Sequence, residues 1–277
     1  MKDSQTKIAL VTGATDGVGR VVAQNLGAGR AHVLVHGRDR ARGERVVAEI
    51  EAAGGTAQFL AADFSALAEV RRLAETVRLS APRLDLLINN AGIGSGGSKG
   101  VRQTSADGYE LRFAVNYLAG FLLTRLLLPL LEASAPARIV NVSSLGQQAI
   151  DFDDVMLTHG YSGTRAYSQS KLAQIMFTID LARELEHTGV TANALHPATY
   201  MNTTMVRLSG ITPTSTVEDG AKAILNLATA AEIEGRSGLF FNGLRQGRPD
   251  AQANDAAARQ RLRALSLKLT GLAAAEA

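Results

Sequence analysis

The sequence predicts a single α/β domain in which a doubly wound parallel sheet of about seven strands carries helices on both faces. Three observations lead to this prediction. Short apolar runs alternate with helix-like stretches, a glycine-rich turn follows the first run, and 46% hydrophobic residues over 277 positions suffice for one large core. The domain should span residues 1–277, with a flexible N-terminus at 1–6 and a helical extension at 246–277.

The first third of the chain shows the alternation most clearly. Apolar runs predict strands at 8–12, 31–36, 56–61 and 84–89. Helix-like stretches occupy the intervals at 20–27, 41–53 and 66–78. Elements in this order form parallel sheets, whose ligands lie at the carboxyl ends of the strands.

The rest of the chain continues the pattern with longer helices. Two consecutive helical stretches are expected at 107–132 and one long helix at 167–186, with strands at 138–142, 190–196 and 239–241. The amphipathic residues 251–272 predict a last helix that packs on its own core or on a sister subunit. A membrane anchor is the alternative for this helix.

Composition narrows the class of protein. The absence of cysteine excludes disulfides, thiolate metal sites and a thiol nucleophile, and the five histidines show no metal-binding spacing. No apolar run reaches membrane-spanning length and no signal core follows Met1. A net charge of +3 with scattered arginines indicates solvated helix faces rather than nucleic-acid binding. We therefore expect a cytoplasmic protein with no nucleic-acid, membrane or metal partner.

The turn after the first strand has the composition of a dinucleotide-binding loop. The residues Thr12-Gly13-Ala14-Thr15-Asp16-Gly17-Val18-Gly19 lie between a predicted strand and a predicted helix. Small residues allow the backbone to approach a pyrophosphate, and the helix N-terminus offers free N–H groups with partial positive charge. A tight turn that binds no ligand is the less favoured alternative.

Tyr167 and Lys171 lie four residues apart in the long predicted helix and therefore share one of its faces. A fixed ammonium within ~4–6 Å lowers the pKa of a phenol from ~10 toward neutrality. A phenol tuned in this way can donate and accept a proton in catalysis. Two surface side chains on an amphipathic helix are the alternative.

Six motifs in order carry a resemblance to a known family. They are Thr12-Gly-x-x-x-Gly17-x-Gly19, Asn89-Asn90-Ala91-Gly92, Asn116, Val142-Ser143-Ser144, Tyr167-x-x-x-Lys171 and His196-Pro197. Together they resemble the short-chain dehydrogenase/reductase family over about residues 7–245. The stretches 138–144 and 170–174 look most like its retinol-dehydrogenase-like branch. The resemblance implies a Rossmann-type fold and an oxidoreductase that acts on an alcohol or a carbonyl compound.

The resemblance also implies the roles of the catalytic residues. Tyr167 would exchange the proton, and Ser144 would bond the substrate oxygen. Lys171 would hold the nicotinamide ribose and acidify Tyr167, while Asn116 would hold a water that relays protons to Lys171.

The cofactor contacts implied by the resemblance surround these residues. Asp63 would bond the adenine amino group, and Asn90 would support the central strands and the cofactor ribose. The full expected set is Gly13, Thr15, Asp16, Gly17, Val18, Gly19, Arg38, Asp63, Phe64, Asn90, Ala91, Gly92, Tyr167, Lys171, Pro197 and Thr203.

One position departs from the family pattern, which has Pro-Gly after the sixth strand and a Ser or Thr about five residues later. Here Ala198 follows Pro197, and Thr203 comes one position later than the pattern requires. Thr203 is the expected contact to the nicotinamide amide, and Thr199 is the alternative.

The end of the second strand favours NADP(H), with NAD(H) as the second option. An acid at Gly37 would bond a ribose 2′-OH and repel a 2′-phosphate, whereas glycine leaves room for the phosphate. Arg38 supplies a fork of donors suited to phosphate oxygens, and Arg42 adds a second charge. Asp39 lies near the usual offset of a ribose-binding acid, but we expect it to cap the next helix.

A carbonyl reductase or alcohol dehydrogenase is therefore the favoured function, with a small-molecule carbonyl or alcohol as substrate. An epimerase or dehydratase with a bound nicotinamide and a non-enzymatic redox sensor are the alternatives. Segments 92–103, 147–163 and 199–214 should determine the substrate. Residues 92–100 are either a mobile rim loop or a linker, and residues 147–163 either a lid or a solvated insertion. An apolar surface expected on the helices from Tyr117 and Tyr167 predicts a homodimer or homotetramer, with a monomer as the alternative.

Overall fold

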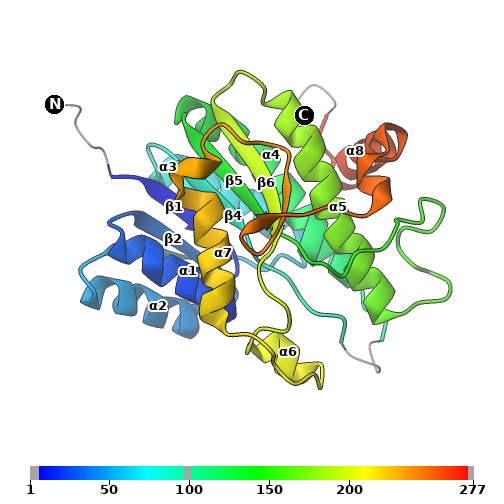
Figure 1. Ribbon diagram of the computed structural model, residues 1–277, viewed down its shortest axis with the longest axis horizontal. Helices are drawn as coiled ribbons and strands as arrows, with labels where there is room; N and C mark the ends of the chain where they lie inside the picture. The colour runs from blue at the N-terminus through cyan, green and yellow to red at the C-terminus, as the bar shows by residue number, and fades with distance from the viewer. Residues whose placement is uncertain (1–5, 97–100, 274–277) are drawn as a thin grey trace.

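The structure is a computed structural model that describes residues 6–96 and 101–273. The predicted flexible N-terminus apart from Thr6, residues 97–100 of the predicted rim loop and residues 274–277 of the predicted extension lie outside the described residues. One sheet, in the strand order β3-β2-β1-β4-β5-β6-β7-β8, runs through the middle of the domain (Figure 1). This arrangement confirms the predicted doubly wound α/β fold.

The strands lie close to the predicted runs. Their bounds are β1 (Ile8–Val11), β2 (His32–Gly37), β3 (Thr56–Ala61), β4 (Leu86–Asn89), β5 (Ala137–Val142), β6 (Val190–His196), β7 (Phe240–Asn242) and β8 (Arg245–Gln246). All neighbours from β1 to β7 pair in parallel, and β8 pairs with β7 antiparallel. The two residues of β8 are exposed, so no apolar pattern could have predicted this eighth strand.

Helices cover both faces of the sheet (Figure 1). One face carries α1 (Gly17–Ala28), α2 (Arg40–Ala52) and α7 (Val217–Thr229), and the other carries α3 (Leu67–Ser80), α4 (Ala119–Ala133) and α5 (Gly163–Glu184). The shorter elements are α6 (Thr204–Leu208), η3 (Ala231–Ile233) and η4 (Ala251–Asn254), and α8 (Ala256–Thr270) follows them. Parallel strands between two helical layers are buried on both sides, as β1 and β4 are throughout.

The two consecutive helical stretches predicted at 107–132 are present, but they start later than expected and the first is a π-helix. Thr104 and Glu110 first form an antiparallel bridge, and the π-helix η2 (Phe113–Leu118) then leads into α4. π-Helical turns occur frequently at functional sites, and this one carries Asn116. Among the described residues, Phe113–Ala133 is the one helical stretch long and apolar enough to cross a membrane. In its most apolar 18-residue segment, 78% is buried inside the fold, as in the core helix of a globular domain.

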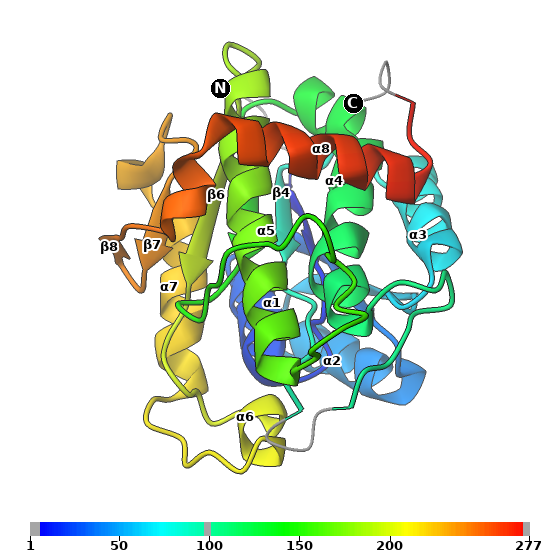
Figure 2. The same ribbon diagram turned by 90° about the vertical axis from the view of Figure 1, so that its right-hand side faces the viewer.

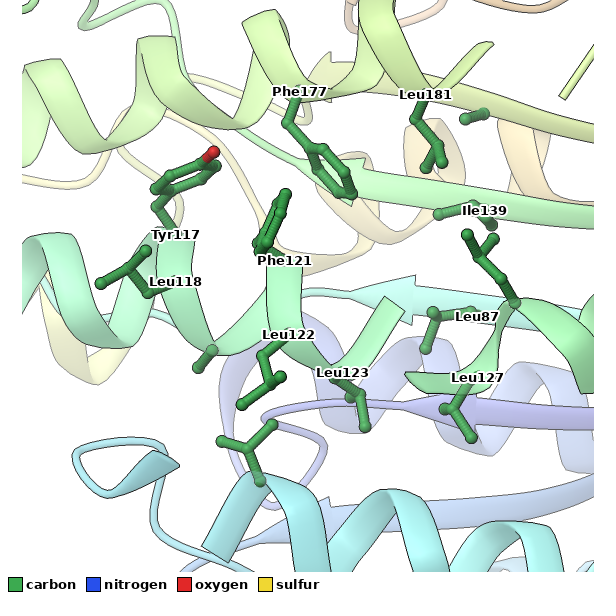
Figure 3. Packing of buried hydrophobic residues seen from close by; sticks show 14 of the residues in the cluster. Leu87, Tyr117, Leu118, Phe121, Leu122, Leu123, Leu127, Ile139, Phe177 and Leu181 are labelled. Atoms are coloured by element: carbon green, nitrogen blue, oxygen red, sulfur yellow. The ribbon is translucent and has the colours of Figure 1, made fainter. Parts of the chain in front are cut away.

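The largest apolar cluster lies between the sheet and the helices α4 and α5 (Figure 3). Phe121 meets Phe177 edge-on with ring centroids 5.0 Å apart, and Tyr117 lies 6.0 Å from Phe121. Leu87 and Ile139 contribute from the sheet side (Figure 3). Aromatic pairs in these geometries stabilise beyond simple burial, so α5 is fixed against the central strands.

A buried polar network ties the same two helices to the sheet. Asn89 Nδ2 donates to Asn141 Oδ1 and to Thr124 Oγ1, both at 2.9 Å, and Asn141 Nδ2 donates to Thr178 Oγ1 at 2.8 Å. The network is not complete, because Asn89 Oδ1 is buried without a hydrogen-bond partner among the described residues, but its three bonds still fix both helices against the sheet. Asn89 thus supports β4 and β5, and it acts beside Asn90, which ties the end of β1 to the end of β4 as predicted.

The last helix, α8, lies across α5 and the start of α4 (Figure 2). Ser266 Oγ lies 2.6 Å from the hydroxyl of Tyr117, and Arg259 Nε donates to Asp180 Oδ1 at 2.6 Å. Burial raises the pKa of Tyr117 well above its ordinary value. The helix predicted at 251–272 thus packs on its own core. The apolar surface that we expected around Tyr117 is covered by the chain itself.

Candidate active site

The turn between β1 and α1 requires its glycines. Gly13 has φ +64° and Gly17 has φ +54°, in the left-handed region that glycine alone enters freely. A Cβ on Gly19 would lie 2.3 Å from the carbonyl oxygen of Gly13. Asp16 caps α1 by accepting from the Gly17 N–H at 2.7 Å. The first N–H groups of α1, on Val18 and Gly19, therefore lie at the carboxyl end of β1, where a helix N-terminus favours an anion.

Thr12 and Asn90 hold this turn to the end of β4. Asn90 Nδ2 donates to the carbonyls of Thr12 at 2.8 Å and Gly13 at 3.1 Å. Thr12 Oγ1 accepts from the backbone N–H groups of Asn90 at 2.9 Å and Ala91 at 3.0 Å. A Cβ on Gly13 would lie 2.8 Å from Ala91 Cα. The strand order reverses between β1 and β4, which is where doubly wound sheets bind their ligands.

The end of β2 forms a cationic corner beside the turn. Thr15 packs against Gly37, where a Cβ would lie 2.4 Å from Thr15 Cγ2. Asp39 caps α2 by accepting from the Arg42 N–H at 3.0 Å, as predicted, and its carboxylate lies 3.5 Å from Arg42 Nε. Arg38 is exposed and forms no ion pair with any described residue. Arg38 is therefore the cation at this corner that remains available to a ligand.

The predicted adenine contacts lie at the same edge, directly after β3. Asp63 Oδ1 accepts from the Ser65 N–H at 2.9 Å in a local turn. Phe64 is buried and stacks on His36 with ring centroids 4.3 Å apart. The side chain of Phe64 therefore belongs to the core, and a ligand can meet only its backbone.

Asn116 joins the start of the rim loop to α5. Its Oδ1 accepts from the Ile93 N–H at 2.7 Å, and its Nδ2 donates to Ile93 O at 3.1 Å and Ser170 Oγ at 3.0 Å. One acceptor position on Oδ1 remains for the predicted relay water. A Cβ on Gly92 would lie 3.2 Å from Asn116 Oδ1 and 3.5 Å from Lys171 Nζ, so glycine keeps the space between these two groups open.

Ser144 and Tyr167 meet at the carboxyl end of β5. Ser144 Oγ accepts from the Gly146 N–H at 3.0 Å and is hydrogen-bonded to the phenol of Tyr167. A Cβ on Gly146 would lie 3.5 Å from Ser144 Oγ and 3.7 Å from Tyr167 Cε1. Two neighbouring hydroxyl groups can donate hydrogen bonds to the same substrate oxygen.

The electrostatics of Tyr167 differ from our prediction. Lys171 Nζ donates to Val142 O at 2.9 Å and to Gln174 Oε1 at 3.0 Å, and it lies 5.7 Å from the centroid of the Tyr167 ring. Burial lowers the pKa of Lys171 to about 7. Burial also raises the pKa of Tyr167, and the bond to Ser144 offsets this only in part. The predicted acidification of Tyr167 by Lys171 is wrong for this structure, because desolvation of the phenol dominates its pKa.

Helix α6 brings the segment after β6 back to the glycine turn. Thr203 caps α6 by accepting from the Val206 N–H at 3.3 Å, and its Cγ2 lies 3.3 Å from the place of a Cβ on Gly17. Thr204 Oγ1 donates to Asp16 Oδ2 at 2.8 Å. This arrangement closes the segment over the predicted pyrophosphate turn.

The two threonines considered after Pro197 have different positions. Thr199 Oγ1 lies 3.1 Å from His196 Nε2, while Thr203 lies against the glycine turn. The structure therefore favours Thr203 as the residue that can reach a cofactor.

The segment at 147–163 packs on α5 and η4. Gln169 Nε2 donates to Val155 O at 2.6 Å, and the amide of Gln252 bonds both the N–H and the carbonyl of Ile150 at 2.7 Å and 3.1 Å. The side chain of Asp153 is 96% exposed, which agrees with the solvated interpretation for this acid, whereas Asp154 is 22% exposed and accepts from the N–H groups of Thr158 and His159. These bonds hold the segment against α5 and η4, and nothing in its contacts supports the lid interpretation.

A buried ionic cluster, which no motif predicts, fixes the rim loop. Arg112 Nε and Nη2 donate to the carbonyls of Gly94 at 2.9 Å and Ser95 at 2.8 Å, and its Nη1 donates to Tyr161 OH at 2.6 Å. Tyr161 OH donates in turn to Glu110 Oε1 at 3.1 Å. Burial, first of all, raises the pKa of Tyr161 to about 12. The described part of the loop predicted to be mobile is therefore tied to the segment before α5.

Comparison with known sequences identifies the family of this chain. A family profile described as short chain dehydrogenase matches residues 7–212. Retinol dehydrogenase 13 from Homo sapiens is 37% identical over 97% of this chain and 86% of its own length. Polyprenol dehydrogenase from Mus musculus is 36% identical over 96% of this chain and 84% of its own length.

Comparison with solved structures gives the same fold. A protein from Mycobacterium paratuberculosis, described as putative and uncharacterized, superposes with a TM-score of 0.78 and 31% identity over 96% of this chain and 94% of its own. A Pseudomonas aeruginosa RhlG/NADP active-site complex gives 0.70 and 28% over 86% and 95%. A 3-ketoacyl-(acyl-carrier-protein) reductase from Brucella melitensis complexed with NADH gives 0.69 and 26% over 85% and 96%.

Proposed function

The chain belongs to the short-chain dehydrogenase family, in its retinol-dehydrogenase-like branch, and from this premise we propose that it oxidises alcohols or reduces carbonyl compounds with NADP(H). The observation that carries this proposal is the convergence of Ser144, Tyr167, Lys171 and Asn116. They lie at the carboxyl ends of the central strands, beside the glycine turn.

The residues around the glycine turn fit a dinucleotide. The helix N-terminus and the close approaches at Gly13 and Gly19 suit a pyrophosphate, and Asp63 lies at the same edge of the sheet. Arg38, exposed and without an ion pair among the described residues, suits the 2′-phosphate that distinguishes NADP(H) from NAD(H). The relatives bound to NADP and to NADH support both forms, with NADP(H) preferred.

A bound nicotinamide would supply or accept the hydride. The side chains of this protein would stabilise the charge on the substrate oxygen and exchange the proton. The hydroxyl groups of Ser144 and Tyr167 would donate to the carbonyl oxygen, where negative charge develops during reduction. Tyr167 would release its proton to that oxygen in reduction and take one up in oxidation. Its raised pKa keeps the phenol protonated, which suits the proton-donating direction.

The surface around the site supports an apolar substrate. The exposed large hydrophobic side chains nearest the rim and α6 are Val101, Leu145, Tyr200, Met205, Leu208 and Ile211. Met205 Cγ would lie 2.9 Å from a Cβ on Gly94, so α6 covers the rim loop directly. The names of the relatives, retinol and polyprenol dehydrogenases, support a long apolar alcohol or its carbonyl counterpart.

We propose a monomer, although the sequence favoured a homodimer or homotetramer. Helix α8 covers the face around Tyr117 that we expected to mediate association. Light scattering at micromolar concentration should give 29.2 kDa, and twice this mass would restore the sequence-based prediction. The cytoplasm is the proposed location, which cell fractionation tests.

A panel of aldehydes and ketones with increasing apolar chain length tests the function. We expect carbonyl-dependent loss of reduced-nicotinamide absorbance with NADPH, and we expect Ser144→Ala to lose most of this activity while binding NADPH normally. Nucleotide binding without net consumption for any carbonyl would instead support an epimerase, a dehydratase or a redox sensor.

A further inference from the structure

We propose that His36 is a positioning residue that sets the conformation of the glycine turn for the cofactor, an inference that rests on the proposed nucleotide-dependent function. His36 belongs to neither the glycine-rich motif nor the catalytic motifs of the sequence. Its side chain is 2% exposed and lies directly beneath the turn.

Both ring nitrogens of His36 have defined partners. The Gly13 N–H donates to Nδ1 at 3.3 Å, and Nε2 lies 3.1 Å from the carbonyl oxygen of Ala62. A backbone N–H can only donate and a carbonyl can only accept, so Nδ1 must carry a lone pair and Nε2 a hydrogen. The imidazole is therefore neutral and in a single tautomer.

The backbone of His36 reinforces the same contact. Its carbonyl accepts from the Ala14 N–H at 2.8 Å. The first two N–H groups of the turn, on Gly13 and Ala14, thus both point at His36. Gly13 is left-handed, and its Cα approaches Ala91 so closely that no side chain fits. The bond to Nδ1 orients the peptide at the point where the backbone bends toward the ligand site.

The imidazole also connects the turn to the predicted adenine contacts. Its ring stacks on Phe64 at 4.3 Å with an interplanar angle of 22°, and Nε2 bonds the residue just before Asp63. The carboxylate of Asp63 is the charged group that acts on this ring. One side chain from β2 thus fixes the ends of β1 and β3 relative to one another, and these ends carry the pyrophosphate and adenine contacts.

Three substitutions separate the two bonds of the ring. The Oδ1 of Asn stands at the same number of bonds from Cβ as Nδ1, so His36→Asn keeps an acceptor for Gly13. The Nε2 of Gln corresponds to the imidazole Nε2, so His36→Gln keeps a donor for Ala62. His36→Phe keeps the ring against Phe64 and removes both bonds. His32→Asn, on the more exposed start of the same strand, is the matched control.

The dissociation constants for NADPH and the thermal midpoints of these variants test the proposal. We expect His36→Asn and His32→Asn to bind NADPH within about threefold of the parent. His36→Gln and His36→Phe should bind about tenfold or more weakly, because the buried Gly13 N–H loses its acceptor. The midpoints should rank oppositely, with the smaller Asn least stable because it leaves a cavity.

The opposite ranking distinguishes a positioning role from a structural one. If NADPH affinity followed the thermal midpoints, with Asn binding most weakly, or if all variants bound equally, His36 would have no positioning role. If the parent itself did not bind NADPH, the proposed function would fail, and this outcome is separate from the ranking among variants.

Discussion

Two regions of this protein prepare a site by opposite means. The nucleotide corner consists of the glycine turn and the end of β2, and the catalytic row consists of Asn116, Ser144, Tyr167 and Lys171. In the corner, the charged groups are exposed: the side chains of Arg42 and Asp16 are 56% and 50% accessible, and the shape is set by backbone bonds and close glycine contacts. In the catalytic row, Ser144 and Lys171 are buried, at 9% and 5% exposure, and Tyr167 is half-buried.

This difference determines what each region contributes to stability. Exposed ion pairs contribute at most about 1 kcal/mol, so the corner costs the fold little. A buried ammonium opposes folding unless its partners compensate for the lost hydration. The catalytic row therefore lowers the stability of the fold in order to hold its reactive groups. The nucleotide corner holds its binding groups with almost no loss of stability.

The largest effect should follow from removing the phenol of the catalytic row. Tyr167→Phe should lower kcat by ~10²–10⁴-fold, because the general acid is lost, and should leave NADPH affinity near that of the parent. Tyr109→Phe is the matched control, since its phenol bonds Leu269 O in α8 at 2.9 Å, away from the site. Steady-state kinetics with one carbonyl substrate measure the effect. A variant that keeps most of the parent's kcat would show that Tyr167 is not the general acid.

Replacing the buried Lys171 should increase the stability of the fold. The pKa of Lys171 falls from an ordinary 10.5 to about 7, so between these values the unfolded chain binds more protons than the folded one. Stability should therefore rise as the pH increases through this window and be reduced at neutral pH. Lys171→Met should abolish activity and raise the thermal midpoint by several degrees, for a net gain of roughly 1–3 kcal/mol after the loss of two hydrogen bonds.

Thermal melts of parent and variant at neutral and alkaline pH measure this effect. The difference between them should shrink as the pH rises. A midpoint for Lys171→Met below that of the parent at neutral pH would mean that the two bonds of Lys171 outweigh its desolvation, and the contrast between the regions would disappear.

The corner should affect affinity and leave chemistry unchanged. Arg38→Ala should weaken NADPH binding by about tenfold or more and barely change NADH binding, since a charge-assisted hydrogen bond contributes ~1.5–3 kcal/mol. Arg40→Ala is the matched control, because Arg40 pairs with Glu44 at 3.3 Å and lies over the ring of Phe59. Equal losses for both nucleotides, or none, would show that Arg38 is a solvated residue.

His36 is the buried exception within the corner and should give it a pH dependence. Burial lowers its pKa from 6.5 to about 4, so the unfolded chain binds the extra proton between these values and stability falls as the pH decreases. At about 1.36 kcal/mol per pH unit, the loss from His36 at pH ~5 is roughly 2 kcal/mol. His36→Phe should remove this part of the slope in denaturant titrations. The remainder comes partly from His196, whose pKa also falls to about 4. An unchanged slope would contradict the neutral tautomer.

The sequence predicted most of the sheet and the positions of the motif residues. The predicted ranges 56–61 and 190–196 coincide with β3 and β6, because apolar runs and turn residues mark such strands locally. The glycine turn, the Asp39 cap and the meeting of Ser144 with Tyr167 also follow from local spacing and family motifs.

What the sequence could not predict depends on burial and on contacts between distant segments. The pKa of Tyr167 is raised instead of lowered, since desolvation is a property of the packed site. Arg112 binds a loop seventeen or more residues away, and His36 bonds Gly13 across two strands, without any motif that marks either contact. The cover of Tyr117 by Ser266 joins residues 149 positions apart.

The transfer of deuterium from NADPH that carries deuterium at both positions of the nicotinamide C4 tests most directly that the two regions form one active site. Mass spectrometry of the alcohol produced from an apolar aldehyde should show one deuterium on the former carbonyl carbon with the parent protein. Tyr167→Phe should form this product ~10²–10⁴-fold more slowly. Product without deuterium, or labelled NADPH that stays unconsumed with every carbonyl tried, would contradict the account.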